Sequence, residues 1–206
     1  MHSIRFPAGL ALALAVALVL DAAPGACEPR LLQLDPAASR VEYHITHTLK
    51  DVTDLAGTPE GHVRLDTTDG VWVLEGRASV DLRALVTGNG TRDRHVKSAD
   101  YLDVERYPTA TFHIVEAIAD PSLAVASDST HAAWIGRVRG PLAVHGVEHM
   151  LEVPMRFDAV PGREGALRAR GRFILQLADF AIPRPKKLML AAGTSVEVRL
   201  DLVFVP

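Results

Sequence analysis

Cysteine is almost absent from this chain of 206 residues, and this absence narrows its chemistry. Cys27 is the single cysteine, so an intramolecular disulfide and a cysteine-based metal cage are both excluded. An oxidising compartment is therefore compatible with the chain but is not required by it. Aromatic side chains are also few, at 5% of residues.

The chain also lacks a large excess of charge of one sign, and it lacks long apolar runs. The chain carries 22 Lys and Arg against 25 Asp and Glu, for a net charge of −3. A mildly acidic chain lacks the basic surface that binds phosphates, so we expect no nucleic-acid partner. No apolar run reaches the roughly 20 residues that span a bilayer, so we expect no membrane span.

The N-terminus has the organisation of an export signal. A short segment with Arg5 precedes the apolar run Leu10–Leu20, and small residues follow up to Cys27. This order predicts a signal peptide over residues 1–26, removed from a single domain over residues 27–206. We therefore expect a periplasmic or secreted protein. Acylation of Cys27, giving an outer-membrane lipoprotein with a lipid anchor, is the less favoured alternative.

Alternation of apolar and polar residues with a period of two dominates the rest of the chain. Each alternating segment places one apolar face inward and one charged face in water, which is typical of antiparallel sheet and argues against βαβ units. His145-Gly146 is expected to be a hairpin turn. About eight strands after Arg30 predict an all-β, eight-stranded antiparallel barrel. The clearest segments are 41–47, 72–80, 111–114, 134–144, 151–159, 167–176 and 196–204.

The inward faces of these strands supply a predicted cavity wall. A barrel of eight strands either fills with side chains or holds one small ligand. The few aromatics and the inward glycines Gly136, Gly140 and Gly171 favour an enclosed void, because such glycines mark barrel corners or the close approach of a ligand. The predicted ligand-binding wall is Tyr43, Ile45, His47, Trp72, Leu74, Phe112, Ile114, Trp134, Val138, Leu142, Met155, Phe157, Phe173 and Leu175.

The segment near residues 91–102 breaks the alternation and is predicted to be a short helical crossover. Arg92, Asp93, His95 and Asp100 lie in it. An Asp–His pair is typical of acid–base catalysis, but no nucleophile elbow accompanies it. We therefore predict a structural network that holds the crossover on the barrel, with no catalytic residue.

Histidine offers a second alternative chemistry. His47, His95 and His145 would be the ligands of a metal site if the fold brought them together, but their spacing matches no short-range metal motif. We therefore predict no metal and expect these imidazoles to bind backbone or a ligand hydroxyl. Tyr43, His47 and His145 are the polar residues expected to select a head group at one end of the cavity.

Several tracts of the chain together resemble the YceI-like family of lipid- and polyisoprenoid-binding proteins. The resemblance implies a lipocalin-like barrel of eight strands with a helix in the crossover. It also implies a long apolar cavity for an isoprenoid chain, a quinone or another lipid, and an exported, usually periplasmic, location. The tracts that carry it are 92–103 with 107–112, 41–47, 78–81, 140–147 and 179–182.

The chain departs from that family pattern in a few places. Pro59 lies where the family continues a strand, and proline is tolerated there only at an edge. Leu177 and Ala178 replace a basic residue that the family often carries before its late Asp-Phe pair. Residues 183–187 lengthen the loop before the last strand.

The sequence thus predicts an exported lipid-binding protein that is not an enzyme. The family resemblance implies that it holds an isoprenoid-type lipid, either a polyisoprenoid or a quinone, inside the barrel for transport, storage or sequestration. No other cofactor is expected. A transient membrane-protein partner and a homodimer stay open. The alternatives are an enzyme or redox accessory acting on a quinone-like lipid through the Arg92, Asp93 and His95 region, and a stress-related structural module without ligand.

Overall fold

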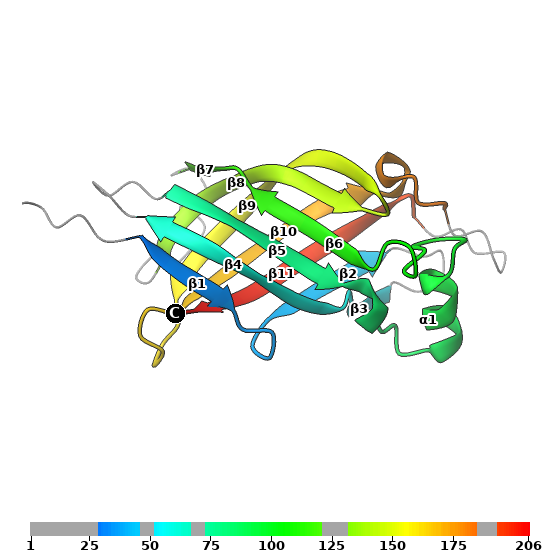
Figure 1. Cartoon of the computed structure of the whole chain (residues 1–206), viewed down its shortest axis with the longest axis horizontal. Helices are drawn as coiled ribbons and strands as arrows, with labels where there is room; N and C mark the ends of the chain where they lie inside the picture. Colours follow the sequence, from blue (N-terminus) through cyan, green and yellow to red (C-terminus); the bar gives the residue numbers. More distant parts are fainter. Residues whose placement is uncertain (1–28, 46–51, 67–72, 121–131, 185–192) are drawn as a thin grey trace, which may run out of the picture.

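The computed structural model shows a barrel of antiparallel strands with a short helix, α1, at one end (Figure 1). It describes residues 29–45, 52–66, 73–120, 132–184 and 193–206. The predicted signal peptide and Cys27 lie outside the described residues.

In the described part of the chain, the strands β1 to β5 precede the helical crossover and the strands β6 to β11 follow it. The strands are β1 (Arg30–Leu34), β2 (Arg40–Ile45), β3 (Val52–Leu55), β4 (Thr58–Asp66), β5 (Val73–Asp81), β6 (Thr109–Ile114), β7 (Glu116–Ala119), β8 (Ala132–Val144), β9 (Val147–Ala159), β10 (Leu167–Gln176) and β11 (Ser195–Val205). Helix α1 spans Gly90–Lys97, and two 3-10 helices, η2 (Leu82–Ala84) and η4 (Leu177–Phe180), complete the set.

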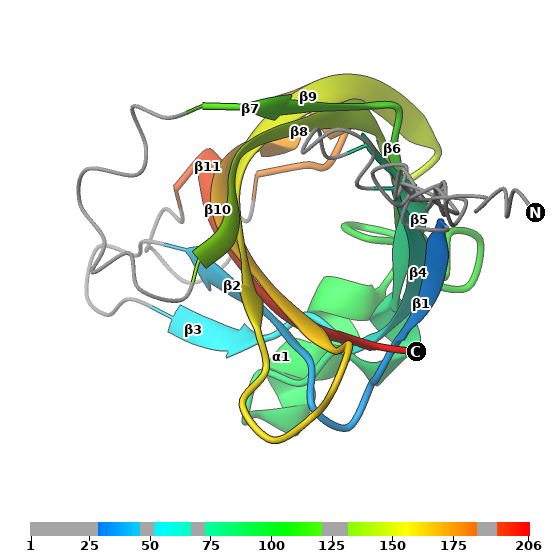
Figure 2. The same cartoon turned by 90° about the vertical axis from the view of Figure 1, so that its left-hand side faces the viewer.

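The strand pairings place these strands at eight positions around the barrel. The view along the barrel shows a closed ring (Figure 2). β1 and β2 pair with the same neighbour, β11, and β6 and β7 share the neighbour β8. β3 pairs with β2, and β4 pairs with β1. The ring closes where Gln33 and Leu34 pair with Val205 and Phe204. The prediction of an eight-stranded antiparallel barrel with a helical crossover is confirmed.

A local turn interrupts the position that β1 and β2 share. The Asp35 side chain accepts hydrogen bonds from the amides of Ala37 (3.0 Å) and Ala38 (3.2 Å), which folds the backbone out of the ladder. The Ser39 hydroxyl then accepts a bond from the Val203 amide at 2.9 Å and returns the chain to β11.

Pro59 lies beside this interruption. It pairs with Val80 of β5, while the pairing of β4 with β1 covers only His62 to Leu65. The proline nitrogen carries no hydrogen and cannot donate a hydrogen bond to a neighbouring strand. Pro59 is tolerated because, at its position, β4 pairs with β5 but not with β1. This is the edge-like setting that the sequence required.

Apolar side chains fill the barrel end opposite α1. Leu32, Leu65, Leu74, Phe157 and Phe204 are at most 2% exposed and belong to one core cluster. They lie near the start of β1 and the end of β11, the end marked C in Figure 1. A second cluster, around Leu142, Leu175 and Phe180, lies toward the α1 end.

The inward glycines Gly136, Gly140 and Gly171 make room for neighbouring chain segments. A β-carbon at Gly140 would collide with the carbonyl oxygen of His113, and one at Gly136 with that of Ile118. At Gly171 the Met155 sulfur occupies the space. None of the three borders the barrel cavity, so they serve strand approach rather than ligand approach.

We expect Gly140→Ala to lower the free energy of unfolding by about 1–3 kcal/mol, because the obstructing atom is backbone and strands must move apart. Urea unfolding of the mature protein measures this. Gly90→Ala is the matched control, since its β-carbon meets no atom within 4 Å. Equal unfolding midpoints for the two variants would contradict the assignment.

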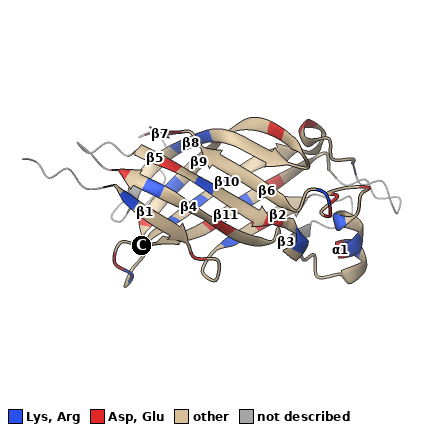
Figure 3. Ribbon diagram, viewed as in Figure 1, with Lys and Arg blue, Asp and Glu red and all other residues tan. Residues whose placement is uncertain are grey.

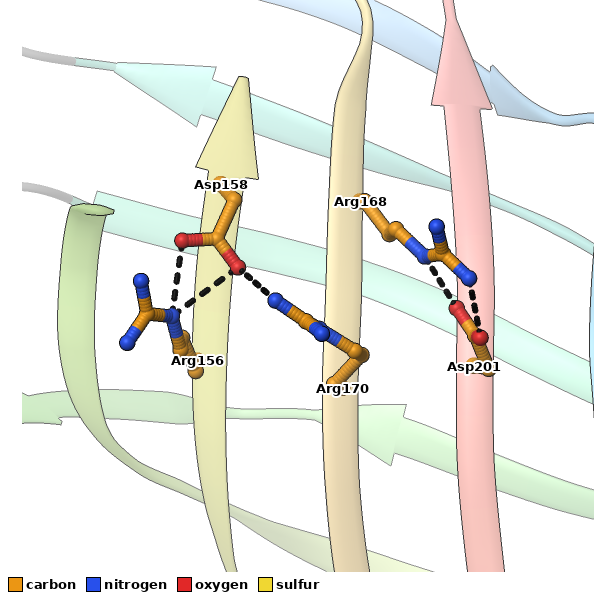
Figure 4. Close-up of polar contacts among 5 residues, drawn as sticks. All are labelled: Arg156, Asp158, Arg168, Arg170 and Asp201. Carbon is orange, nitrogen blue, oxygen red and sulfur yellow. Dashed lines mark hydrogen bonds and ion pairs between the residues drawn. The ribbon is translucent and has the colours of Figure 1, made fainter. Parts of the chain in front are cut away.

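Positions of both charge signs are interspersed along the strands of the barrel (Figure 3), and several of them form ion pairs between partly exposed side chains. Among the described residues, the most buried charged group is Asp158 on β9, whose side chain is 11% exposed. It accepts hydrogen bonds from Arg156 Nε at 2.7 and 3.0 Å and from Arg170 Nη2 at 2.7 Å (Figure 4). One carboxylate therefore ties β9 to β10.

A second carboxylate continues this lattice onto β11. Asp201 accepts a hydrogen bond from Arg168 Nε at 2.6 Å, with a second bond from the same guanidinium (Figure 4). The hydrogen bonds from Arg168 hold the pKa of the Asp201 carboxyl below its usual value. Both partners are more exposed than Asp158, so solvent screens this pair more strongly.

Candidate functional site

The barrel contains a cavity of about 1130 Å³ that is open to the outside. Strands from all sides of the ring contribute to its wall, and most of the lining side chains are apolar. Ten of the fourteen residues predicted for the ligand wall border this space: Tyr43, Ile45, Phe112, Ile114, Val138, Leu142, Met155, Phe157, Phe173 and Leu175.

Leu74 and Trp134 lie elsewhere. Leu74 is 2% exposed and packs in the core cluster at the end opposite α1. Trp134 packs edge-on against Phe157, with ring centroids 5.5 Å apart. Both residues face inward as predicted, but neither borders the cavity, because this end of the barrel is filled by side chains. His47 and Trp72 lie outside the described residues.

Small and β-branched residues that the prediction omitted also form the wall. The alanines Ala78, Ala110 and Ala169 border the cavity from β5, β6 and β10. Their short side chains leave the centre of the barrel open where larger ones would fill it. The same alternation that selected Phe112 and Phe173 would have found them, since they share those inward faces.

The polar part of the cavity lining comes mainly from the crossover. This group, which we call the polar mouth, lies at the α1 end of the barrel (Figure 1). Its side chains are Asn89, Thr91, Arg92, Arg94, His95, Ser98 and Asp100. The cavity is therefore amphiphilic along its length, with an apolar body and a polar, charged opening.

Helix α1 is fixed at the mouth by hydrogen bonds at both ends. Asn89 caps it by accepting from the amides of Thr91 (3.0 Å) and Arg92 (3.1 Å). Lys97 Nζ donates to the carbonyl oxygen of Arg83 at 2.7 Å. The crossover is thereby attached to the residues that follow β5.

The predicted network centres on Thr87, which sequence reasoning had not selected. Asp93 accepts hydrogen bonds from the Thr87 amide (2.8 Å) and hydroxyl, and Arg92 donates to the Thr87 carbonyl. The bonds from Thr87 hold the pKa of the Asp93 carboxyl below its usual value. Thr87 follows Val86, which bridges to Leu55 of β3. These bonds join the crossover to the barrel.

The other two residues of that network are placed differently. His95 packs edge-on against Tyr101, with ring centroids 4.6 Å apart, rather than against Asp93. Its Nε2 is buried and has no hydrogen-bond partner among the described residues. Asp100 is exposed at the mouth. The Asp93–His95 contact on which a catalytic interpretation would depend is thus replaced by contacts to Thr87 and Tyr101.

His145 does not border the cavity. Its Nδ1 lies 3.1 Å from the carbonyl oxygen of Phe180, and its ring lies 5.0 Å from that of Tyr107. His145 and Gly146 both have positive φ angles, of 53° and 76°, as the predicted hairpin turn requires. The expectation that His145 selects a head group is therefore replaced by a structural role, the joining of the β8–β9 turn to η4.

Metal chemistry has no assembled site in the described ranges. No group of three or more His, Cys, Asp or Glu side chains lies close enough there to hold an ion. None of the described helices is long and apolar enough to cross a membrane.

An eight-position antiparallel barrel with an internal, largely apolar cavity and a helical crossover at its mouth defines a lipocalin-like class of protein. Within this class the chain belongs to the YceI-like family, whose domain matches residues 32–204.

Proteins similar to this chain come from several bacteria. A UPF0312 protein of Pseudomonas syringae pv. tomato is 33% identical over 134 residues, which cover 62% of this chain and 60% of that protein. A UPF0312 protein of Vibrio cholerae is 31% identical over 128 residues, covering 60% of this chain and 59% of that protein. The alignments thus span about 60% of the curated relatives.

Two solved structures share the fold at low sequence identity. Burkholderia cenocepacia BcnA superposes with a TM-score of 0.67 at 18% identity, covering 82% of this chain and 98% of that one. A polyisoprenoid binding domain from Saccharophagus degradans, implicated in plant cell wall breakdown, superposes with a TM-score of 0.62 at 17% identity. That alignment covers 85% of this chain and 98% of the domain.

Proposed function

We propose that this protein binds an amphiphilic lipid of the isoprenoid type, with the apolar tail inside the barrel and the head group at the polar mouth. The observation that carries the proposal is the internal cavity of about 1130 Å³ with an apolar body and a polar opening. Family membership and the fold shared with a polyisoprenoid binding domain support it.

The energetics of such binding are sufficient without a covalent bond or a metal. A tail that buries ~600 Å² of apolar surface gains about 15 kcal/mol at ~25 cal/mol per Å². Association and ordering of the tail remove roughly 4–15 kcal/mol of this gain. Micromolar to nanomolar dissociation constants fall within the remaining range.

We propose a binding role rather than a catalytic one. Asp93 is bonded to Thr87, and His95 packs on Tyr101, so neither is arranged as half of an acid–base pair. Export to the periplasm or the medium, with the lipid delivered by a transient membrane partner, completes this proposal and rests on the N-terminal apolar segment.

Native mass spectrometry of the mature protein, purified from a bacterial host without detergent, tests the function. We expect a species heavier than the polypeptide by the mass of one lipid, which organic extraction releases and tandem mass spectrometry identifies. The same spectrum reports the cleavage site and any acylation of Cys27. Only ligand-free protein, together with no uptake of added isoprenoid, would overturn the proposal.

A further inference from the structure

The pairing of β9 with β10 stops partway along the barrel. The ladder between them ends where Gly171 pairs with Met155. Beyond this point both strands continue toward the α1 end (Figure 1), β9 beside β8 and β10 beside β11. Residues 147–154 and 172–176 therefore have no recorded pairing with each other. We call the opening that they leave in the hydrogen-bonded wall the side gap.

The 3-10 helix η4 packs into the side gap. Phe180 at its end is 1% exposed, and its ring lies 5.2 Å from the ring of His149 on β9, edge-on. Phe180 also belongs to one buried cluster with Leu142 of β8 and Leu175 of β10. Side chains of η4 thus close the wall where backbone pairing leaves it open.

The same segment forms part of the inner surface of the barrel. Leu177 and Ile182, at the two ends of η4, border the cavity, whereas Phe180 does not. Phe180 is therefore packed within the wall itself. Movement of η4 away from β9 would give the cavity a second opening, through the side of the barrel.

The attachments of η4 differ on its two sides. Toward β11, the Leu177 amide donates a backbone hydrogen bond to the Thr194 carbonyl at 3.0 Å. Toward β9, the described part of the chain shows no backbone–backbone hydrogen bond from η4. The contacts there come from side chains, with His145 Nδ1 3.1 Å from the Phe180 carbonyl oxygen and His149 against the Phe180 ring. A segment fixed at one end and packed at the other can open locally without unfolding the sheet.

The backbone at the end of η4 is strained in the closed position. Ala181 has a φ of 53° and a ψ of 24°, the left-handed conformation. This conformation is normal for glycine at the end of a helix but unfavourable for alanine, because its β-carbon crowds the following carbonyl. Opening of η4 would release this strain, so the strain lowers the free-energy difference between the closed and the open state.

The end of the barrel beside α1 is a less favourable passage for a hydrocarbon tail. The helix is held there by the Asn89 cap and by the bond of Lys97, and the opening is lined by polar side chains. Around the side gap, by contrast, Leu151, Phe173 and Leu175 form an apolar surface. A tail that passes between β9 and β10 keeps its contact with apolar side chains throughout.

We propose that η4 is a gate in the barrel wall, and that the apolar tail of the ligand enters and leaves the cavity sideways, between β9 and β10, when η4 moves outward. This inference rests on the proposed function, because it concerns the route by which that ligand reaches the cavity. It predicts changes in the rates of uptake and release rather than in affinity.

A removable clamp across the side gap tests the route. In a Cys27→Ser background, Met150→Cys and Ile174→Cys place thiols on the outer faces of β9 and β10, at positions where the native side chains are 53% exposed. A bis-methanethiosulfonate linker joins the two thiols, and dithiothreitol removes it. Stopped-flow uptake of a fluorescent isoprenoid should slow by about tenfold or more in the clamped protein, as expected when a lid limits the rate, and should recover after reduction.

Arg139→Cys with Glu152→Cys is the matched control for the clamp. These two residues pair directly in the continuous ladder of β8 and β9, and their side chains are 52% and 46% exposed. The same linker there ties two strands that the proposal does not require to separate. The uptake rate should therefore stay within about twofold, with or without the linker.

His149→Ala tests the contact that holds the gate closed. Loss of the edge-on ring contact with Phe180 should raise the uptake and release rates by about three- to tenfold each. The dissociation constant should stay within about twofold, because a gate changes the barrier and not the bound state. His113→Ala is the control, since His113 is an exposed histidine of β6 that does not border the cavity, and it should leave both rates unchanged.

The outcomes separate the gate from the proposed function. Undiminished uptake by the protein clamped between positions 150 and 174, or equal slowing by the control clamp, would overturn the side route and leave lipid binding intact. Unchanged rates in His149→Ala would overturn the role of η4 as the moving element. Failure of the unaltered protein to bind the fluorescent isoprenoid would overturn the proposed function itself.

Discussion

Ala78→Trp is expected to lower the affinity for an isoprenoid by more than tenfold while leaving the barrel folded. Ala78 lies on β5, opposite Phe112 of β6, and borders the cavity. An indole there would occupy space that a bound tail would fill. Displacing roughly 60–100 Å² of tail contact costs about 1.5–2.5 kcal/mol, which corresponds to more than a tenfold change. Competition with a fluorescent isoprenoid measures the affinity, and circular dichroism reports the fold.

Glu75→Trp provides the matched control for this experiment. Glu75 lies on the same strand with its side chain exposed, and it does not border the cavity. The same indole on the outer face should change the affinity by about twofold or less, as expected for a surface substitution away from the site. Equal losses in both variants would indicate a general effect on the barrel and contradict an interior site.

Asp158→Ala is expected to lower the free energy of unfolding by roughly 2–3 kcal/mol. The substitution leaves Arg156 and Arg170 facing each other across β9 and β10 without the carboxylate that joins them. Breaking a fully buried pair from one side costs about 3–5 kcal/mol. The expected value is smaller because the Arg170 side chain is 49% exposed. Urea denaturation followed by circular dichroism measures it.

Asp201→Ala is the comparison variant. Its carboxylate also binds an arginine, Arg168, but the two side chains are 34% and 47% exposed. Solvent screening limits the expected loss to at most about 1 kcal/mol. A loss at Asp201 equal to or larger than that at Asp158 would show that burial does not decide the strength of this outer lattice.

The strands at the C-terminal end of the barrel were predictable because their alternation is long and regular. Segment 167–176 coincides with β10 (Leu167–Gln176), and 196–204 differs from β11 (Ser195–Val205) by one residue at each end. Charged residues such as Arg168 and Arg170 show which face of the strand points to solvent and which points into the barrel. The His145-Gly146 turn was predictable for a local reason, since it needs residues that accept positive φ.

The interruptions of the ring were not predictable from alternation. β1 and β2 are separated by a turn that depends on the Asp35 carboxylate and on a bond from the Val203 amide to Ser39, 164 residues away in sequence. β6 and β7 are short, and both pair with β8. Sequence periodicity contains no information on such distant partners.

The candidate site shows a similar division. Alternation states which side of the sheet a residue faces but not its depth along the barrel. Leu74 therefore lies in the filled end, while Ala78, four residues further along β5, borders the cavity. From the sequence, the polar residues of the crossover were predicted only as a structural network that holds the crossover on the barrel. The separation of Asp93, bound to Thr87, from Arg94, at the opening, requires the three-dimensional path of the crossover.

Photocrosslinking tests most directly whether the lipid tail lies inside the barrel. The probe is a geranylgeraniol analogue with a diazirine at the end of its tail, irradiated with the mature protein and mapped by peptide mass spectrometry. We predict labels on cavity-facing residues, such as Phe112, Val138 and Phe173, and competition by the unlabelled lipid. Labels confined to exposed apolar residues of the outer face, such as Met150 and Ile174, would contradict binding in the barrel.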